Sequence, residues 1–328
     1  MTPLPLPVGI ATGIDTLLDR SVALGFSRIG PAVRRLLPTW PADPPADALS
    51  GRTIVVTGAT SGLGLATAHG VLGLGGRLVL VARNEKKSAG VCADLTAAHP
   101  GAEIGTVLAD LADLDDVRRA AAELAVLGPI HAIVHNAGLM PPERSESPQG
   151  HELTMAVHVL GPVLMTELLR PSLASGARII MVTSGGMYAQ KLRADDPDYL
   201  TGDYSPTTAY ARSKRAQVEL LPLLGERWGA DTGNDVLVYA THPGWADTPG
   251  VVESLPTFHA LTGPVLRDVA GGAETTVWLT ATEPAPPAGT LLHDRRVRPT
   301  HFRPGTRPSS GDVARMWSWV RAQTGLEA

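Results

Sequence analysis

The chain has 328 residues, of which 44% are hydrophobic, so it is long enough for one large α/β domain or two small ones around a buried core. A net charge of −4, without a dense Lys/Arg block interleaved with aromatics, indicates a small-molecule ligand and no nucleic-acid partner. The single cysteine, Cys92, excludes an internal disulfide framework and a Cys/His zinc cluster, so we expect no metal and a reducing, cytoplasmic location.

Residues 8–37 form the first distinct segment. Apolar residues from Ile10 to Ile29 recur near helical spacing among charged ones, which predicts an amphipathic helix and no apolar run long enough to cross a bilayer. Two interpretations stay open: packing on the main domain or on a second copy in a homo-oligomer, or a peripheral membrane contact. Four Asp and four Arg in residues 1–50 balance each other and favour packing. Proline-rich residues 38–45 predict a stiff linker, so residues 1–48 form an extension.

A strand, a glycine turn and a helix follow in residues 53–71. Residues 53–56 favour β-structure, and the glycines let the backbone approach a bound group. The first helical turn has free N–H donors and a positive dipole end, so a diphosphate fits there. A turn that only packs is the alternative. The residues expected to bind a cofactor here are Thr57, Gly58, Thr60, Ser61, Gly62, Leu63 and Gly64.

The second predicted strand, residues 77–81, ends close to a basic side chain. In a dinucleotide-binding fold, a carboxylate after this strand binds the ribose 2′-hydroxyl, whereas an arginine binds a 2′-phosphate. Here the position offers Ala82, Arg83 and Asn84, with no carboxylate before Glu85. The ribose site therefore predicts NADP(H) rather than NAD, with Arg83 and Asn84 as cofactor-binding residues. An ordinary surface arginine is the alternative.

Polar residues also follow the next strands. Residues 104–108 precede Asp110 and Leu111, and residues 130–134 precede Asn136, Ala137 and Gly138. Helical segments lie between the strands, which predicts right-handed crossovers and an α/β fold: a Rossmann-like doubly wound parallel sheet with helices on both faces. Because ligands bind at the carboxyl ends of parallel strands, we expect all these residues to lie at one cofactor site.

The second half of the domain repeats the pattern. Residues 152–169 predict a long helix, residues 178–183 a strand ending at Ser184, and residues 185–206 a long polar loop. A helix over 207–228 carries Tyr210 and Lys214 one turn apart. A strand over 236–240 leads to Pro243, Gly244 and Thr248, also expected at the cofactor. A helix over 273–280 and a strand at 291–292 complete the domain assigned to residues 49–295, and residues 296–328 predict an Arg-rich tail with a short helix.

Tyr210 and Lys214 suit a particular chemistry. Hydride transfer to a carbonyl needs a proton donor at the oxygen, and the reverse reaction needs a base there. A phenol does this at neutral pH only if its pKa is lowered, which a nearby ammonium and the positive charge of an oxidised nicotinamide favour. Of the five tyrosines, only Tyr210 has a lysine four residues later. Both residues are therefore candidate catalytic and cofactor-binding groups.

Taken together, residues 50–295 resemble the short-chain dehydrogenase/reductase family. The family's TGxxxGxG turn falls on residues 57–64, its NNAG motif on residues 135–138, its serine on Ser184 and its YxxxK pair on Tyr210 and Lys214. The runs from Ser184 and His242 are similar to the member-12 type. The resemblance implies that Tyr210 donates or accepts the proton, that Lys214 lowers its pKa and holds the nicotinamide ribose, and that Ser184 hydrogen-bonds the reacting oxygen.

Two positions depart from the family pattern. His135 replaces the first asparagine of NNAG, and His158 stands where the family has an asparagine that helps to hold a water through a helix kink. If His158 points into the site, it replaces that asparagine as a catalytic residue and titrates near neutrality. If it points away, the path that the resemblance implies for protons, from the tyrosine through the ribose and the lysine towards solvent, is broken or rerouted. We favour the first outcome.

The sequence thus predicts an NADP(H)-dependent oxidoreductase that interconverts an alcohol and a ketone or aldehyde. The substrate is expected to be apolar, because Met187, Leu192, Leu255, Phe258 and Leu261 would line the pocket. A non-catalytic NADP(H)-binding sensor or scaffold is the main alternative, and a sugar-nucleotide epimerase is a third. Residues before Ala46 are expected to be dispensable for cofactor binding.

Overall fold

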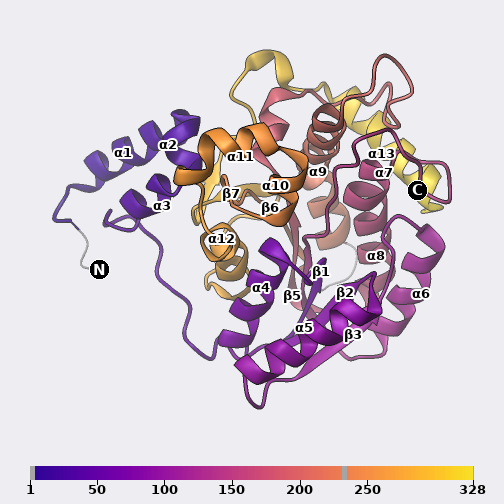
Figure 1. Ribbon diagram of the computed structural model, residues 1–328, viewed down its shortest axis with the longest axis horizontal. Helices are drawn as coiled ribbons and strands as arrows, with labels where there is room; N and C mark the ends of the chain where they lie inside the picture. The colour runs from indigo at the N-terminus through magenta and orange to yellow at the C-terminus, as the bar shows by residue number, and fades with distance from the viewer. Residues whose placement is uncertain (1–3, 231–234, 328) are drawn as a thin grey trace.

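The computed structural model describes residues 4–230 and 235–327, which contain an eight-stranded sheet in the order β3-β2-β1-β4-β5-β6-β7-β8 (Figure 1). Strands β1 to β7 run parallel, and β8 pairs antiparallel with β7 at the edge. The predicted doubly wound parallel sheet is confirmed. The strands are β1 Thr53–Thr57, β2 Arg77–Ala82, β3 Ile104–Leu108, β4 Ile130–His135, β5 Leu173–Val182, β6 Leu237–Thr241, β7 Thr290–His293 and β8 Arg296–Arg298.

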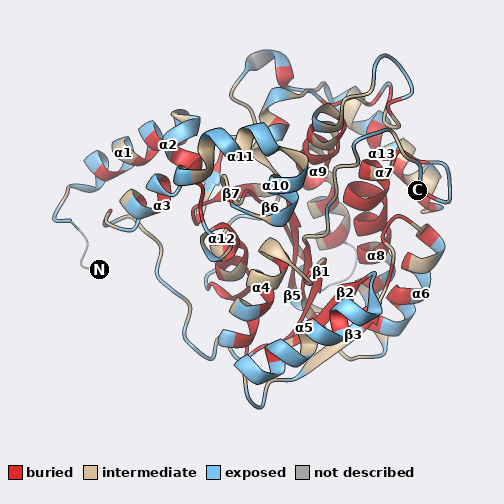
Figure 2. Cartoon of the chain, viewed as in Figure 1, coloured by how far each residue is buried: buried red, intermediate tan, exposed pale blue. Residues whose placement is uncertain are grey.

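Helices cover both faces of this sheet because successive strand residues point to opposite sides. Val55 packs in a core with α6, α8 and α9, whereas Ile54 and Val56 pack with α4, α5 and α12, and both cores are buried (Figure 2). The helices of the main domain are α4 Gly62–Gly73, α5 Glu85–Ala98, α6 Leu114–Ala125, α7 Leu153–Met155, α8 Gly161–Leu169, α9 Pro206–Ala230, α10 Pro249–Ser254, α11 Pro256–Thr262, α12 Val269–Ala281 and α13 Ser310–Thr324.

Most predicted elements lie within a few residues of the observed ones, and the differences are confined to a few places. The helix expected over 152–169 is interrupted by a π-helix, Ala156–Leu160, between α7 and α8. The expected domain boundary at residue 295 falls between β7 and β8, which pair with each other in the same sheet. The helix expected in the C-terminal tail is α13, which has 15 residues. One helical run in the described chain, Leu153–Ser172, is apolar and long enough to span a membrane. However, 78% of its apolar stretch is buried inside the protein, as in a core helix.

The N-terminal extension forms three helices instead of one: α1 Val8–Arg20, α2 Val22–Phe26 and α3 Ile29–Arg34. A buried ion network joins it to the far end of the chain. Asp15 pairs with Arg34 at 2.7 Å and with Arg298 of β8 at 2.8 Å, and Arg34 also pairs with Asp294 after β7. Each of these side chains is less than a tenth exposed. The extension therefore packs on the main domain.

The proline-rich segment after α3 is docked as well. The Trp278 indole N–H of α12 donates to the Ala42 carbonyl at 2.9 Å, and Arg295 donates to the Pro41 carbonyl at 2.9 Å. The Arg295 guanidinium also lies 5.0 Å from the centre of the Trp40 ring. These contacts and the ion network argue against the expectation that residues before Ala46 are dispensable, since their removal leaves buried charges without partners.

Candidate active site

The glycine turn after β1 is locked to the end of β4. The Thr57 hydroxyl oxygen accepts from the backbone N–H groups of Asn136, at 3.1 Å, and Ala137, at 3.0 Å. The Asn136 side chain donates to the carbonyl oxygens of Thr57 and Gly58 at 3.1 and 3.3 Å. Gly58 has φ +66°, and a Cβ there would lie 2.7 Å from Ala137 Cα. Only glycine fits, and two strand ends form one rigid edge.

The start of α4 presents backbone donors at this edge. The helix begins at Gly62, and within the described chain the Ser61 side chain makes no capping hydrogen bond to it. The first N–H groups, from residues 62–64, are thus available to an anion, as expected for the turn that also contains Thr60 and Leu63. Thr248 caps α10 and lies beside this start, because a Cβ on Gly62 would be 3.6 Å from Thr248 Cβ. The cradle fits a dinucleotide diphosphate.

The predicted ribose end lies at the tips of β2 and β3. Arg83 follows the buried Ala82, and 71% of its side chain is exposed, with its guanidinium 3.8 Å from the Asp110 carboxylate. Asn84 acts as the cap of α5, accepting from the Lys87 N–H at 2.8 Å. Leu111 is buried beside Asp110. The Arg83 guanidinium is therefore available to a 2′-phosphate, while the Asn84 side chain is engaged in the helix cap.

Ser184, Tyr210 and Lys214 meet at the carboxyl end of β5. Tyr210 and Lys214 lie one turn apart on α9, and Ser184 directly follows the buried Thr183. The Ser184 side chain hydrogen-bonds the Tyr210 side chain. The Lys214 ammonium donates to the Val182 carbonyl at 2.8 Å and lies 5.6 Å from the centre of the Tyr210 ring. The geometry brings all three predicted catalytic groups together.

Burial sets the charge states of this pair. Burial lowers the pKa of Lys214 to about 7. Burial also raises the pKa of Tyr210, and its hydrogen bond with Ser184 opposes that rise only in part. In the chain without cofactor, Lys214 does not bring the Tyr210 pKa below its ordinary value, because burial has the larger effect. The second charge in the argument, that of an oxidised nicotinamide, belongs to the cofactor.

His158 lies in the site, at the π-helix between α7 and α8. Its Nε2 accepts from the Leu139 N–H at 3.1 Å, and its Nδ1 lies 2.7 Å from the Ser213 hydroxyl. Because a backbone N–H can only donate, the ring proton is on Nδ1. The Ser213 hydroxyl in turn donates to the Tyr210 carbonyl at 2.8 Å, and the two rings stand edge to face at 5.4 Å. His158 therefore links the segment after β4 to α9, the helix that carries Tyr210 and Lys214.

The expectation that His158 titrates near neutrality is wrong. Burial lowers its pKa well below the usual range, and the nearby Lys214 lowers it further. Both ring nitrogens are also engaged with protein groups, so a second ring proton would break the bond from Leu139. The other departure, His135, is buried against the Thr166 hydroxyl at 2.8 Å, and burial lowers its pKa to about 3. Both histidines are neutral.

The turn after β6 rests on a residue that the sequence did not point to. Phe26, from the N-terminal extension, packs on His242 with the rings tilted and their centres 4.4 Å apart. A Cβ on Gly244, which follows Pro243, would lie 2.6 Å from the Phe26 carbonyl oxygen, and one on Gly185 would lie 3.2 Å from its ring. Phe26 thus supports both loops beside Ser184. No local pattern could have identified it, since it lies more than 150 residues before Ser184.

The residues expected to line an apolar pocket divide into two groups. Met187 and Leu192 belong to the buried core, so their expected role in the pocket is wrong. Leu255 and Phe258 are partly exposed on the flap formed by α10 and α11, and Phe258 packs edge to face on Trp245 at 5.3 Å. Leu261 is 79% exposed and points to solvent.

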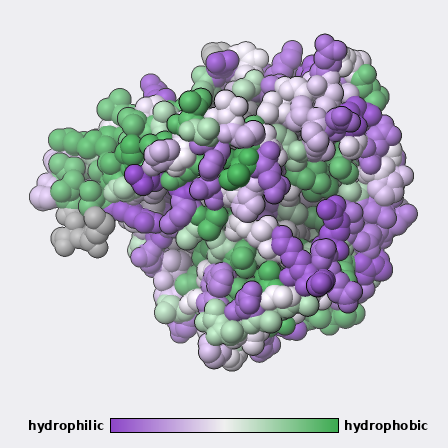
Figure 3. Space-filling model, in the orientation of Figure 1, coloured by the Kyte–Doolittle hydropathy of each residue, from purple (hydrophilic) through white to green (hydrophobic). Residues whose placement is uncertain are grey.

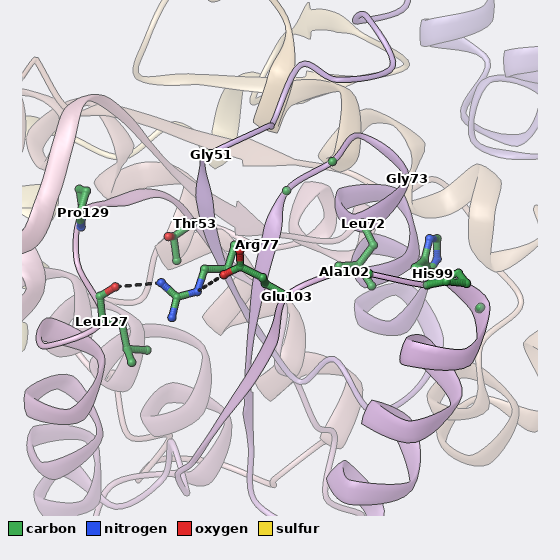
Figure 4. A pocket seen from close by; sticks show the side chains of 15 residues that line it. Gly51, Thr53, Leu72, Gly73, Arg77, His99, Ala102, Glu103, Leu127 and Pro129 are labelled. Carbon is green, nitrogen blue, oxygen red and sulfur yellow. Dashed lines mark hydrogen bonds and ion pairs between the residues drawn. The ribbon is translucent and has the colours of Figure 1, made fainter.

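A cavity of about 720 Å³ lies away from this chemistry (Figure 4). It is lined by Thr53, Arg77 and Glu103 at the amino ends of β1, β2 and β3, the edge opposite the cofactor cradle. Its arginine is engaged with the Leu127 carbonyl and Glu103. Among the described residues, no group of three or more His, Cys, Asp or Glu side chains could hold a metal ion.

Known proteins are similar to this chain in sequence. The model of the short chain dehydrogenase family matches residues 52–257. Over 264 residues the chain is 36% identical to the Bos taurus protein named dehydrogenase/reductase SDR family member 12, covering 79% of this chain and 81% of that one. It is 35% identical over 295 residues to DnrU of Streptomyces sp. (strain C5), named as a candidate daunorubicin C-13 ketoreductase, covering 88% and 98%.

A solved structure agrees in fold. The blue fluorescent protein from a metagenomic library, in complex with NADPH, superposes with a TM-score of 0.61 at 24% identity, covering 75% of this chain and 96% of that chain. The family match over residues 52–257 includes the cofactor cradle and the cluster of Ser184, Tyr210 and Lys214. The chain belongs to the short-chain dehydrogenase/reductase family.

Proposed function

We propose that this oxidoreductase-family protein is an NADP(H)-dependent enzyme that interconverts an alcohol and a ketone or aldehyde. The observation that carries the proposal is the meeting of Ser184, Tyr210 and Lys214 at the same sheet edge as the glycine cradle. A sensor that only binds the cofactor needs the cradle but not this cluster. The cluster therefore favours turnover over the scaffold alternative.

Each group has a role that its position supports. The cofactor supplies the hydride when bound. Because Ser184 already bonds the Tyr210 side chain, one carbonyl oxygen can contact both hydroxyls, and Tyr210 then gives or takes the proton. Lys214 lies close enough to bias Tyr210 toward phenolate when it is charged, and it would hold the nicotinamide ribose. His158 is a positioning residue, because it acts through Leu139 and Ser213.

Preference for NADP(H) over NAD(H) rests on Arg83. Its exposed guanidinium follows β2 where a carboxylate would otherwise bind the 2′-hydroxyl. The matched structure in complex with NADPH is consistent with this choice. Asp110, at 3.8 Å, would compete only weakly for Arg83, since the Arg83 side chain is 71% exposed.

We propose that the substrate is a bulky apolar carbonyl compound or the matching alcohol. Trp245, Phe258 and Leu255 give the flap side of the site an apolar and aromatic surface. The Streptomyces relative is named as a candidate daunorubicin C-13 ketoreductase, so its name gives daunorubicin as the carbonyl substrate of that protein. A cytoplasmic location and a homo-oligomer stay predictions.

The test is NADPH oxidation by the full-length protein against a panel of apolar ketones, aldehydes and quinones. We expect turnover of several apolar members, and a loss of about 100-fold in Ser184→Ala. Ser318→Ala, on an exposed serine of α13, is the matched control and should keep full activity. NADPH binding without turnover of any carbonyl would favour the sensor. Activity confined to small hydrophilic sugars would refute the apolar site.

A further inference from the structure

Helix α1 buries its acidic side chains and exposes an apolar ridge. Ile10, Ile14 and Leu17, spaced i, i+4 and i+7, form its apolar ridge, and Ile10 and Leu17 are 54% and 70% exposed. Asp15 and Asp19 lie on the opposite side and are only 5% and 6% exposed. An amphipathic helix of a soluble domain normally buries its apolar side. Here the side that packs on the protein carries Asp15 and Asp19 together with Ala11 and Leu18, and the apolar ridge is left for another contact.

The exposed apolar side chains continue beyond α1. Figure 3 shows hydrophobic residues gathered over the arm formed by α1 and α2. We call this the N-terminal apolar surface; besides Ile10 and Leu17 it contains Val8, Val22, Leu24 and Ile29, each between 38% and 67% exposed. The Arg28 N–H donates to the Val265 carbonyl at 3.0 Å, which places the arm next to the segment that follows the exposed Leu261. Apolar patches of this kind mark interaction sites.

Charge selects the occupant of this surface. In residues 4–42, all of which are described, the only acidic side chains are Asp15 and Asp19, and both are buried. Asp15 is paired with Arg34 and Arg298, and Asp19 lies 3.5 Å from Arg298. The exposed charged side chains of the same residues are Arg20, Arg28 and Arg35. The exposed charges of residues 4–42 are therefore all cationic, whereas the other two aspartates of the extension, Asp43 and Asp47, are exposed in the segment after Trp40.

We propose that the N-terminal apolar surface docks the protein on an anionic lipid surface. Leu17 and its neighbours would enter the interface, and the three arginines would contact lipid headgroups. A second copy of the chain is the competing occupant, but a two-fold interface opposes the same patch to itself and would bring arginines against arginines. Anionic lipid complements both features. No catalytic step enters this inference, so it is independent of the proposed function.

The N-terminal apolar surface lies next to the candidate active site. The last residue of α2, Phe26, packs on His242 and on the loop after Ser184. The flap that carries Leu261 begins at Thr248, beside the cofactor cradle. Lipid contact would therefore bring the apolar flap near the membrane.

The experiment is co-sedimentation of the full-length protein with vesicles, measured at low and high salt. One set contains phosphatidylcholine and phosphatidylglycerol in equal parts, and the other contains phosphatidylcholine alone. Leu17→Ser tests the apolar contact, with Val126→Ser, at an 82% exposed position of the main domain, as its matched control. A triple variant with glutamine at Arg20, Arg28 and Arg35 tests the charges, with Arg315→Gln on α13 as control.

We expect binding to the anionic vesicles that weakens with salt and is much lower on phosphatidylcholine alone. The triple variant should lose about 100-fold in affinity, about fivefold for each arginine. Leu17→Ser should lose about tenfold, and both controls should bind like the wild type. All substituted side chains are exposed, so near-ultraviolet circular dichroism should be unchanged.

Three results would overturn the proposal. The first is equal sedimentation of the wild type with and without anionic vesicles. The second is equal binding of Leu17→Ser and its control. The third is a dimer in sedimentation equilibrium that Leu17→Ser dissociates, without vesicle binding, which would assign the surface to a second copy of the chain.

Discussion

Replacing Lys214 by methionine should abolish turnover and yet make the cofactor-free protein more stable at neutral pH. The Lys214 side chain is 2% exposed, and burial lowers its pKa from 10.5 to about 7. In the unfolded chain the pKa is ordinary, so between these two values the unfolded state binds more protons than the folded state. The destabilisation is complete below pH 7 and disappears as the pH rises toward 10.5.

The magnitude follows from the same two pKa values. A fall from 10.5 to about 7 corresponds to about 5 kcal/mol of unfavourable burial when the lysine is protonated. The wild type should therefore gain about 2 kcal/mol of unfolding free energy between pH 7 and pH 9. Methionine keeps the apolar stem and needs no partner, but it leaves the Val182 carbonyl without its ammonium donor, at a cost of about 1–2 kcal/mol. The expected net gain at pH 7 is about 2–4 kcal/mol.

The assay is urea unfolding of wild type and Lys214→Met at pH 7, 8 and 9 without cofactor, with Lys191→Met on an exposed lysine as control. The advantage of Lys214→Met should shrink by about 2 kcal/mol over this range, and the control should differ little from the wild type at each pH. A Lys214→Met protein that is less stable than the wild type at pH 7 would refute the reasoning. So would an advantage that does not depend on pH.

Three further predictions test other parts of the account. Arg83→Ala should weaken NADPH binding by one to two orders of magnitude and leave NADH binding unchanged in fluorescence titrations, because a charge-assisted bond contributes about 1.5–3 kcal/mol; equal losses for both cofactors would contradict the assignment. His158→Asn should lower the unfolding free energy by about 1–3 kcal/mol, because a shorter amide cannot bond both Leu139 and Ser213, while the pH–rate profile between pH 6 and 8 keeps its shape; a component that disappears in the variant would show that His158 titrates. A chain lacking residues 1–45 should unfold at a lower temperature and lose NADPH binding, since Arg267 then lacks the three backbone acceptors that it has in residues 25–27; unchanged affinity would show the extension to be dispensable.

The sequence predicts well what depends on neighbouring residues. The strand ends, the glycine turn and the Tyr210 and Lys214 pair are visible because each is a short pattern with a fixed period or spacing. Parallel topology then brings these patterns to one edge, so the site follows from the fold class without any contact being known. This is why Ser184 could be placed beside a helix that begins more than twenty residues later.

Contacts between distant segments could not be predicted in this way. The partners of His158 come from the end of β4 and from α9, so its neutral state is decided by packing rather than by residue type. The acidic residues of α1 illustrate the same limit, because a charge count does not distinguish exposed from buried carboxylates. Asp15 and Asp19 are half of the acidic residues that balance the arginines of residues 1–50, and both are buried beside Arg298, about 280 residues away.

The most direct test of the central claim is single-turnover oxidation of bound NADPH with an apolar ketone, followed by absorbance, in wild type and Tyr210→Phe. If Tyr210 is the proton donor, both proteins should bind NADPH with similar affinity, and the variant should transfer hydride at least about 100-fold more slowly. Equal single-turnover rates, or a wild type that binds NADPH and transfers no hydride to any carbonyl, would contradict the account.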